Sequence, residues 1–313
     1  MKILIVASFN AGKFNSFVTE QAEALKKEGC DVDYFGIVGK GYEGYFSNRR
    51  FYLEKIREFK PNLVHAHGGL SGLFAVLQNE VPVVITFHNG EILSTSTNLL
   101  SSIGAMRAKF VVYVAEHIRQ LSYYKAKHYT FIPCGINLSD CNVTPFESAR
   151  KTLGFEDDKK YILFGGAFEN LRKNYPLLKE AVSLLPDKDK VVCLEMKGLT
   201  RAECTLRMCA CDLFALPTKS EGSPQALKEA MACNCPIVAT DVADIKHLLG
   251  DLEGHYICQF NAQDLANQIA KAFQFGKRTN GRQRVIDLGL TNDLVAKKLV
   301  PIYIEVLKQQ HDS

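Results

Sequence analysis

Two glutamates and the stretch that holds them carry the clearest chemical signal in the chain. Glu221 and Glu229 have the spacing Glu-x7-Glu within residues 213–240, which read LFALPTKSEGSPQALKEAMACNCPIVAT. A carboxylate can accept hydrogen bonds from two adjacent hydroxyl groups at once, so this pair suits the recognition of sugar hydroxyls. The plainer interpretation is that both are solvated surface residues, as most glutamates are.

The pattern around the two glutamates predicts a strand, a loop, a helix and a second strand. The apolar runs are 213–216, which Pro217 ends, and 237–239, and such a unit builds a parallel sheet. We expect Ser223 to cap the helix and Pro224 to take its first position, where a missing N–H costs nothing. Free backbone N–H groups at Gln225 and its neighbours would then form an anion site suited to a phosphate.

Residues 220–240 resemble the donor-site signature SEGxPxxxxEAMAxxxPIVAT of glycosyltransferase family 4, retaining enzymes of the GT-B fold. The resemblance implies that Glu229 binds the ribose hydroxyls of a nucleotide sugar and that Glu221 lies at its sugar ring. It also implies that the helix N–H groups hold the diphosphate. The donor-binding backbone would then comprise Gly222, Ser223, Pro224 and Gln225.

A second part of the implied donor site follows the strand expected at 161–164. Gly165 and Gly166 form a loop there, which we include among the donor-binding residues. The family resemblance implies that Arg172 and Lys173, in ENLRKN, clamp the donor diphosphate. Two cations opposite a helix N-terminus can neutralise a leaving diphosphate without a metal. The alternative is that both are ordinary loop charges.

Three histidines follow strands expected in the first half of the chain. In PNLVHAHGGLSG…VPVVITFHNGE, the family resemblance implies that His88 contacts the donor sugar near the reacting carbon. His67 lies near a strand end and is a further candidate for the site, whereas we expect His65 to be structural. Gly12, in the first loop FNAGK, is either the family's donor-contacting glycine or a plain turn glycine.

The amphipathic, aromatic and basic segment 42–60 is expected to be either an ordinary surface helix or a contact with a membrane that carries a lipid-linked acceptor. The net charge of +4 is too small to indicate nucleic-acid binding. Ten cysteines without a signal peptide, and the lack of an apolar run near 20 residues, favour a cytoplasmic protein, at most at the inner face of the cell membrane. The pairs Cys209-x-Cys211 and Cys233-x-Cys235 do not have the usual zinc spacing, and we expect neither metal nor cofactor.

At 313 residues the chain is long enough for two domains, and the resemblance covers nearly all of it. We expect an α/β GT-B fold, with two Rossmann-like doubly wound domains facing across a cleft. The acceptor-side domain would comprise 1–140 and a C-terminal helix, 298–313, and the nucleotide-sugar domain 141–297.

The resemblance implies a metal-independent retaining glycosyltransferase of bacterial cell-surface polysaccharide or lipopolysaccharide assembly. Its partners would be a nucleotide-diphosphate sugar and a carbohydrate or lipid-linked saccharide acceptor. No carboxylate is clearly placed as a nucleophile, so we expect a front-face reaction in which the leaving phosphate takes the acceptor's proton. The alternatives are a sugar-nucleotide epimerase or hydrolase, and a non-catalytic subunit that binds nucleotide sugars.

Overall fold

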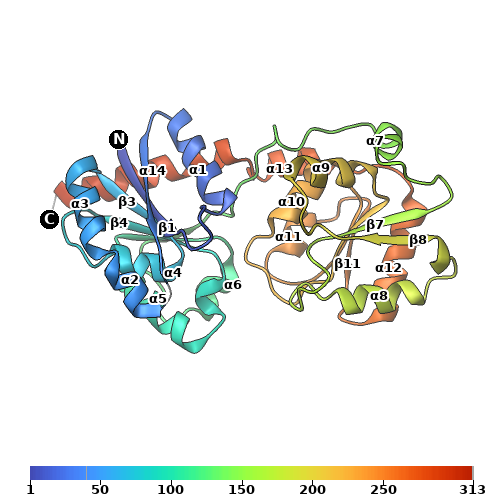
Figure 1. Cartoon of the computed structure of the whole chain (residues 1–313), viewed down its shortest axis with the longest axis horizontal. Coiled ribbons are helices and arrows are strands. Elements are labelled where there is room, and N and C mark those ends of the chain that lie inside the picture. The colour runs from blue at the N-terminus through green and yellow to red at the C-terminus, as the bar shows by residue number, and fades with distance from the viewer. Residues whose placement is uncertain (40, 312–313) are drawn as a thin grey trace. The chain divides into compact units, whose positions relative to one another are not determined.

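The computed structural model describes residues 1–39 and 41–311, and the chain forms two compact units. Unit 1 comprises Met1–Gly135 and Asn292–Ser313, and unit 2 comprises Ile136–Thr291 (Figure 1). Both boundaries lie a few residues before those expected from the sequence. The end of the C-terminal segment, residues 312 and 313, lies outside the described residues.

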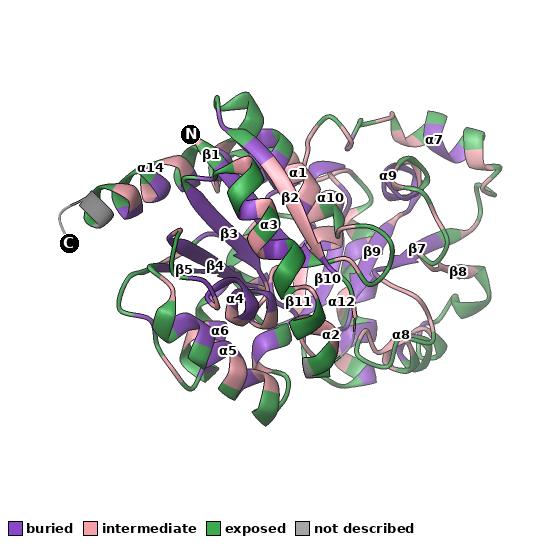
Figure 2. Ribbon diagram, turned by 60° about the vertical axis from the view of Figure 1, so that its left-hand side comes forward, coloured by how far each residue is buried: buried purple, intermediate pink, exposed green. Residues whose placement is uncertain are grey.

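Unit 1 is built on a six-stranded parallel sheet in the order β2-β1-β3-β4-β5-β6. Its strands are β1 (Lys2–Ser8), β2 (Asp31–Ile37), β3 (Leu63–His67), β4 (Val83–Phe87), β5 (Phe110–Tyr113) and β6 (Tyr129–Phe131). Every residue of β3, β4 and β5 is buried, as Figure 2 shows, because helices cover both faces of a parallel sheet.

The helices of unit 1 divide between the two faces of this sheet. Helices α1 and α14 share one apolar core with the sheet, and α3, α4 and α5 share the other. The helical segments are α1 (Ser16–Lys27), α2 (Gly41–Ser47), α3 (Arg49–Phe59), α4 (Gly69–Ala75), the 3-10 turn η1 (Gly90–Ile92), α5 (Thr95–Arg107), α6 (Glu116–Leu121) and α14 (Asn292–His311).

Unit 2 repeats the arrangement with five parallel strands in the order β11-β10-β9-β7-β8. Helices α9, α10, α11 and α13 pack on one face, and α8 and α12 pack on the other. The elements are α7 (Phe146–Leu153), β7 (Lys160–Phe164), α8 (Tyr175–Ser183), η2 (Lys188–Lys190), β8 (Val191–Leu194), α9 (Arg201–Ala210), β9 (Leu213–Leu216), α10 (Gln225–Ala232), β10 (Ile237–Thr240), α11 (Ile245–Leu249), β11 (His255–Cys258), α12 (Ala262–Phe275) and α13 (Gly281–Asp287).

In both sheets the order in which successive strands are added therefore reverses between the first and the third strand of the unit. In such sheets ligands bind beyond the carboxyl ends of the strands at the point of reversal. That point lies between β1 and β3 in unit 1 and between β7 and β9 in unit 2. The expectation of two doubly wound parallel sheets is confirmed, and the topology itself marks one place in each unit where a site should form.

The polar composition of the segment 140–160, with Pro145, predicts a linker between the two domains, but the segment is part of unit 2. It contains α7, whose Ala149 is fully buried in the core that α9 and α10 share. Arg150, on the same helix, forms an ion pair of 3.1 Å with Asp212, and both side chains are nearly sealed from water. The segment belongs to unit 2 because these buried contacts tie it there.

No helix within the described part of the chain is long and apolar enough to cross a membrane. All ten cysteines are free thiols. No group of three or more histidine, cysteine or acidic side chains within the described part of the chain is arranged to hold a metal ion.

Replacing Tyr303 with Phe should destabilise unit 1. The fully buried Tyr303 hydroxyl lies 2.6 Å from Nδ1 of His65, whose Nε2 lies 2.7 Å from the Thr86 hydroxyl. Removing one partner leaves a buried ring nitrogen unsatisfied, so we expect a loss of about 1–3 kcal/mol. Urea unfolding, monitored by hydrogen exchange in unit 1, would measure this loss in the free energy of unfolding. Tyr123→Phe, at an exposed position, is the control, and equal stability of the two variants would contradict the role of this hydrogen bond.

Candidate functional site

The carboxylate of Glu221 is the centre of a polar cluster at the reversal point of unit 2. Its Oε1 accepts hydrogen bonds from Nζ of Lys173 at 2.7 Å and from the hydroxyl of Thr218 at 2.9 Å. Arg172 lies 4.0 Å from the other carboxylate oxygen and donates to the backbone carbonyl of Ser220 at 3.2 Å. The structure thus brings together the three residues that the sequence singled out on the two loops, and it adds Thr218.

This cluster is largely shielded from water, which strengthens its charge interactions. The Glu221 side chain is only 7% exposed and that of Lys173 14%, whereas the Arg172 side chain remains 43% exposed. An isolated buried carboxylate would be costly, and pairing with the Lys173 ammonium offsets that cost. The interpretation of Glu221 and Lys173 as solvated surface charges is wrong.

The glycines after β7 make room for this arrangement. A Cβ atom on Gly166 would lie 2.8 Å from Cγ of Lys173, and one on Gly165 would lie 2.8 Å from side-chain atoms of Phe214 and Leu216. Gly166 therefore lets the lysine stem pass beside the backbone on its way to Glu221. Gly165 lets the end of β7 pack closely against β9.

Helix α10 begins one residue later than the sequence predicted. Pro224, not Ser223, is the N-cap residue, and its carbonyl accepts from the backbone N–H of Lys228 at 3.3 Å. The Ser223 hydroxyl instead accepts a hydrogen bond of 2.9 Å from Nζ of Lys228, a fully buried lysine. A buried ammonium must have acceptors, and Ser223 supplies one. The backbone N–H groups of the first helical turn begin at Gln225. They have no hydrogen-bond partner within the helix, because no helical carbonyl lies four residues before them.

Asp244, in the loop after β10, is an acidic side chain that the sequence analysis missed. Both of its carboxylate oxygens are buried without a hydrogen-bond partner among the described residues. Burial raises the pKa of the Asp244 carboxyl to about 6, the Lys228 ammonium opposes that rise, and the Glu221 charge adds to it. The available signal was its position in the loop four residues beyond β10, because the loops after the carboxyl ends of parallel strands lie at the ligand-binding edge.

Glu229 lies in the second turn of α10, and its side chain is 12% exposed. Its Oε1 lies 3.2 Å from the Arg201 guanidinium, which also contacts Asp140 at 3.0 Å. Arg201 comes from the start of α9, so two helices fix the position of this carboxylate. The structure does not bring Glu229 into the hydrogen-bonded cluster of Glu221, in keeping with a separate role.

In unit 1 the structure brings two of the candidate histidines together at the carboxyl edge of the sheet. Nδ1 of His67 lies 3.1 Å from Nε2 of His88, and the two rings are stacked. Burial lowers the pKa of His67 to about 3, so its ring is neutral at physiological pH. His88 also contacts Phe17, with ring centroids 4.5 Å apart, and the Cys134 sulfur, at 3.3 Å.

Glu91 holds the loop that presents His88. Its two carboxylate oxygens accept from the backbone N–H groups of Gly69, at 2.9 Å, and His88, at 3.0 Å. Burial raises the pKa of Glu91, and these N–H groups act in the opposite direction. Asn89, in the same loop, has a φ of 99°. Asparagine adopts positive φ more readily than most residues, so this position can form the turn without a glycine.

Gly12 lies in an exposed turn with a φ of 70°, and a Cβ atom there would meet nothing within 4 Å. Its conformation favours glycine whether or not the loop contacts a ligand. His65, by contrast, is fully buried, with both ring nitrogens within hydrogen-bond distance of protein groups.

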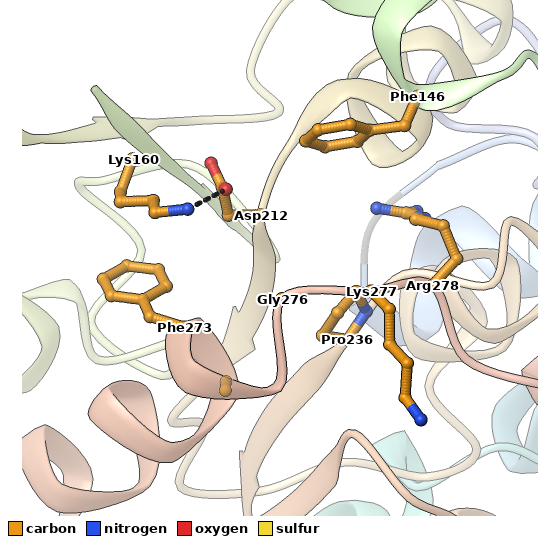
Figure 3. Close-up of a pocket in the computed structure, with 9 residues that line it drawn as sticks. Phe146, Lys160, Asp212, Pro236, Phe273, Gly276, Lys277 and Arg278 are labelled. Atoms are coloured by element: carbon orange, nitrogen blue, oxygen red, sulfur yellow. Dashed lines mark hydrogen bonds and ion pairs between the residues drawn. The ribbon is translucent and has the colours of Figure 1, made fainter. Parts of the chain in front are cut away.

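A separate cavity of about 260 Å³ lies at the amino ends of the unit 2 strands, opposite the Glu221 cluster (Figure 3). Its charged groups are engaged in structural contacts. Lys160 pairs with Asp212 at 3.0 Å, and Arg278 donates to backbone carbonyls, including that of Cys211 at 2.9 Å. These interactions hold the ends of neighbouring strands and helices together. Because the charged groups are used in this way, we do not consider this cavity the functional site.

Two family models match the chain. Glycosyltransferase Family 4 covers residues 34–140, and Glycosyl transferases group 1 covers residues 198–274. TuaC of Bacillus subtilis, a glycosyltransferase assigned to teichuronic acid biosynthesis, is 29% identical over 69% of the chain. Both family models and this relative are glycosyltransferases, and the chain is similar to glycosyltransferase family 4 over the residues that they match.

A second relative is the N,N'-diacetylbacillosaminyl-diphospho-undecaprenol alpha-1,3-N-acetylgalactosaminyltransferase of Campylobacter jejuni, 26% identical over 62% of the chain. The matches span 62% of TuaC and 58% of the Campylobacter protein, so the chain aligns with somewhat under two thirds of either relative.

Solved structures show the same fold. A sucrose-phosphate synthase from Thermosynechococcus elongatus superposes with a TM-score of 0.82 at 18% identity, over 99% of this chain and 100% of that chain. HepE from Anabaena, solved in complex with UDP, gives 0.79 at 15% identity, over 97% of this chain and 100% of that chain. The expected GT-B fold class is confirmed.

Replacing Asp244 with Asn should stabilise unit 2 at neutral pH. The folded-state pKa of about 6 exceeds the ordinary 3.8, so folding takes up a proton between pH 4 and 6, and above that range the charged carboxylate destabilises the fold. We expect Asp244→Asn to gain on the order of 1–3 kcal/mol at pH 7.5 and almost nothing below pH 4. Denaturant unfolding across this pH range measures the difference.

Asp241→Asn, three residues earlier at an exposed position, is the matched control and should show no such pH dependence. A loss of stability in Asp244→Asn at pH 7.5 would instead show that the Asp244 charge stabilises the buried Lys228.

Proposed function

We propose that the chain is a retaining glycosyltransferase that transfers a sugar from a nucleotide-diphosphate sugar to an acceptor in bacterial cell-surface polysaccharide or lipopolysaccharide assembly. Its matches to the two family models and the names of its relatives from Bacillus subtilis and Campylobacter jejuni support the class of reaction. The observation that carries the proposal is the pair of Lys173 and Glu221 at the reversal point of unit 2, beside the start of α10.

The cluster suits the departure of a diphosphate. A developing phosphate anion is stabilised by nearby positive charge. That charge comes from Lys173, the partly exposed Arg172 and the N–H groups at the start of α10. We propose that these groups stabilise the leaving diphosphate in place of a divalent metal ion. Glu221 keeps Lys173 in place and would orient the sugar, as the family resemblance implies, and His88 would share that task.

The reaction balances without a redox partner. The bond between the anomeric carbon and the diphosphate oxygen breaks, and a bond to the acceptor oxygen forms on the same face of the sugar. The acceptor's proton moves to the departing diphosphate oxygen. Because charge builds up on the leaving group, the cations contribute most in the transition state.

For the acceptor we propose a carbohydrate or a lipid-linked saccharide, with the segment 42–60 at a membrane surface. The segment forms α2 and α3, on which Phe46 and Phe51 are 56% and 63% exposed. Arg49 and Arg50 open α3 and are exposed. Exposed aromatic and basic side chains on one segment suit the interface of an anionic membrane.

Donor binding provides the first test. Thermal-shift measurements against UDP-, GDP- and ADP-sugars should reveal one nucleotide class that raises the melting temperature, because a ligand that binds only the folded state stabilises it. Glu229→Ala should weaken the affinity for that nucleotide sugar about 10-fold or more, since bonds to a charged acceptor contribute about 1.5–3 kcal/mol. Glu253→Ala, at a largely exposed glutamate of the same unit, is the control.

The outcome also separates the alternative functions. Undiminished affinity in Glu229→Ala would contradict the donor-site assignment. Turnover of the nucleotide sugar without any acceptor would indicate a hydrolase or epimerase. Binding without transfer to any acceptor tested would indicate a non-catalytic nucleotide-sugar-binding subunit.

Lys173→Ala should lower the rate of transfer far more than the affinity for the donor. Loss of one charge-stabilising donor in a shielded site typically reduces kcat by about 100- to 1,000-fold. Steady-state kinetics and calorimetry on the same protein separate the two quantities. Lys197→Ala, which removes an exposed lysine of the same unit, should leave both unchanged. A similar loss in both variants would show that Lys173 has no special role.

A further inference from the structure

Unit 1 contains a cavity of about 400 Å³ that the donor-site residues do not use. Its walls come from three helices and the turn after α4, and they include Tyr45 and Phe46 of α2, Leu73 of α4 and Leu100 of α5. This volume falls in the range of small-molecule sites, about 300–1,000 Å³.

The chemistry of the walls selects an apolar ligand. Seven of the ten described lining residues are leucine, phenylalanine or tyrosine, the others are glycine, serine and threonine, and none of these ten carries a charge. A sugar or a phosphate would lose its hydrogen bonds with water and gain few in return. A hydrocarbon chain would instead gain from leaving water.

The position of the cavity connects it with the candidate site. Its lining residues lie in the segments that directly follow the carboxyl ends of β2, β3 and β4. Leu70 is three residues beyond His67, and Ser96 is eight residues beyond His88. The cavity therefore lies at the same edge of the sheet as the two histidines, where ligands of such sheets bind.

The surface beside the cavity is also apolar. Leu99, Ile103 and Met106 follow one another along α5 and are 54%, 41% and 62% exposed. Their spacing places them on one side of the helix, next to the side that carries the lining residue Leu100. Helix α5 contains no acidic residue, and the exposed Arg49 and Arg50 begin the helix that follows α2. Such a surface complements a lipid whose anionic phosphate is followed by a long apolar chain.

We propose that this cavity holds the first part of the hydrocarbon chain of a lipid-linked acceptor. The inference rests on the proposed function, because it names the class of acceptor for that reaction. The chain enters between α2 and α5, and its diphosphate stays outside the uncharged cavity. Binding of the chain would position the saccharide at the carboxyl edge of the unit 1 sheet.

A tryptophan placed at the rim reports directly on this site, because the chain has none. Phe46→Trp introduces a single fluorophore at a lining position that is 56% exposed. We expect farnesyl diphosphate, below its micelle concentration, to shift the emission to shorter wavelength in a saturable manner. Inorganic pyrophosphate should have no effect. Phe260→Trp, at a similarly exposed phenylalanine of unit 2, is the matched control and should not respond.

A second variant tests the interior of the cavity. Leu100→Gln on the Phe46→Trp background places an amide in the apolar wall, at a partly exposed position that folding should tolerate. We expect the affinity for farnesyl diphosphate to fall at least 10-fold, with circular dichroism confirming the fold. An unchanged affinity would overturn the proposal.

Two further results would overturn the proposal and leave the proposed function intact. An equal response to pyrophosphate would show that the site binds the headgroup alone. A response to phosphatidylglycerol vesicles without one to farnesyl diphosphate would show a bilayer contact in place of a chain-binding cavity. Stabilisation by nucleotide sugars, measured separately, depends on unit 2 and tests the proposed function independently.

Discussion

One constraint dominates the functional edge of unit 2: the carboxylate of Glu221 is buried. A charge this far from water must be paired and hydrogen-bonded. Lys173 and Thr218 provide those partners, and Gly166 provides the space that the lysine stem needs. The arrangement fixes a cation at the reversal point of the sheet, beside the start of α10. A nearly buried ion pair contributes little net stability, so its value lies in the position and field of the lysine.

The two units use the same strand order, which explains why their sites lie at corresponding places. The chemistry of the two sites nevertheless differs. In each unit, the loops after the first and third strands meet at the carboxyl edge. Unit 2 places there a cation and carboxylates, which suit a diphosphate and sugar hydroxyls. Unit 1 places there the neutral pair of His67 and His88, with an apolar cavity nearby. The architecture is repeated, whereas the ligand chemistry depends on which side chains the loops carry.

Much of this could be predicted from residues alone, and the omissions have physical causes. Strand β9 was predicted with the bounds it has, because a continuous apolar run identifies a buried parallel strand. Strands β2 and β11 were not identified, because polar or aromatic residues interrupt their apolar pattern. Strand β8 was also missed, although its four residues are all apolar. The segment 140–160 was interpreted as a linker because composition does not reveal the burial of single residues such as Ala149.

The sequence by itself indicated the resemblance to family 4, the class of fold and the residue types of the candidate donor site, because the motif at 220–240 and the periodicity of the strands are local properties. Only the tertiary structure decided that Lys228 is fully buried, that Asp244 has no partner among the described residues, and that Arg201 holds Glu229. Burial and pairing depend on residues distant in the chain that packing brings together. A local pattern therefore names the groups of a site but does not determine the charge and environment in which they act.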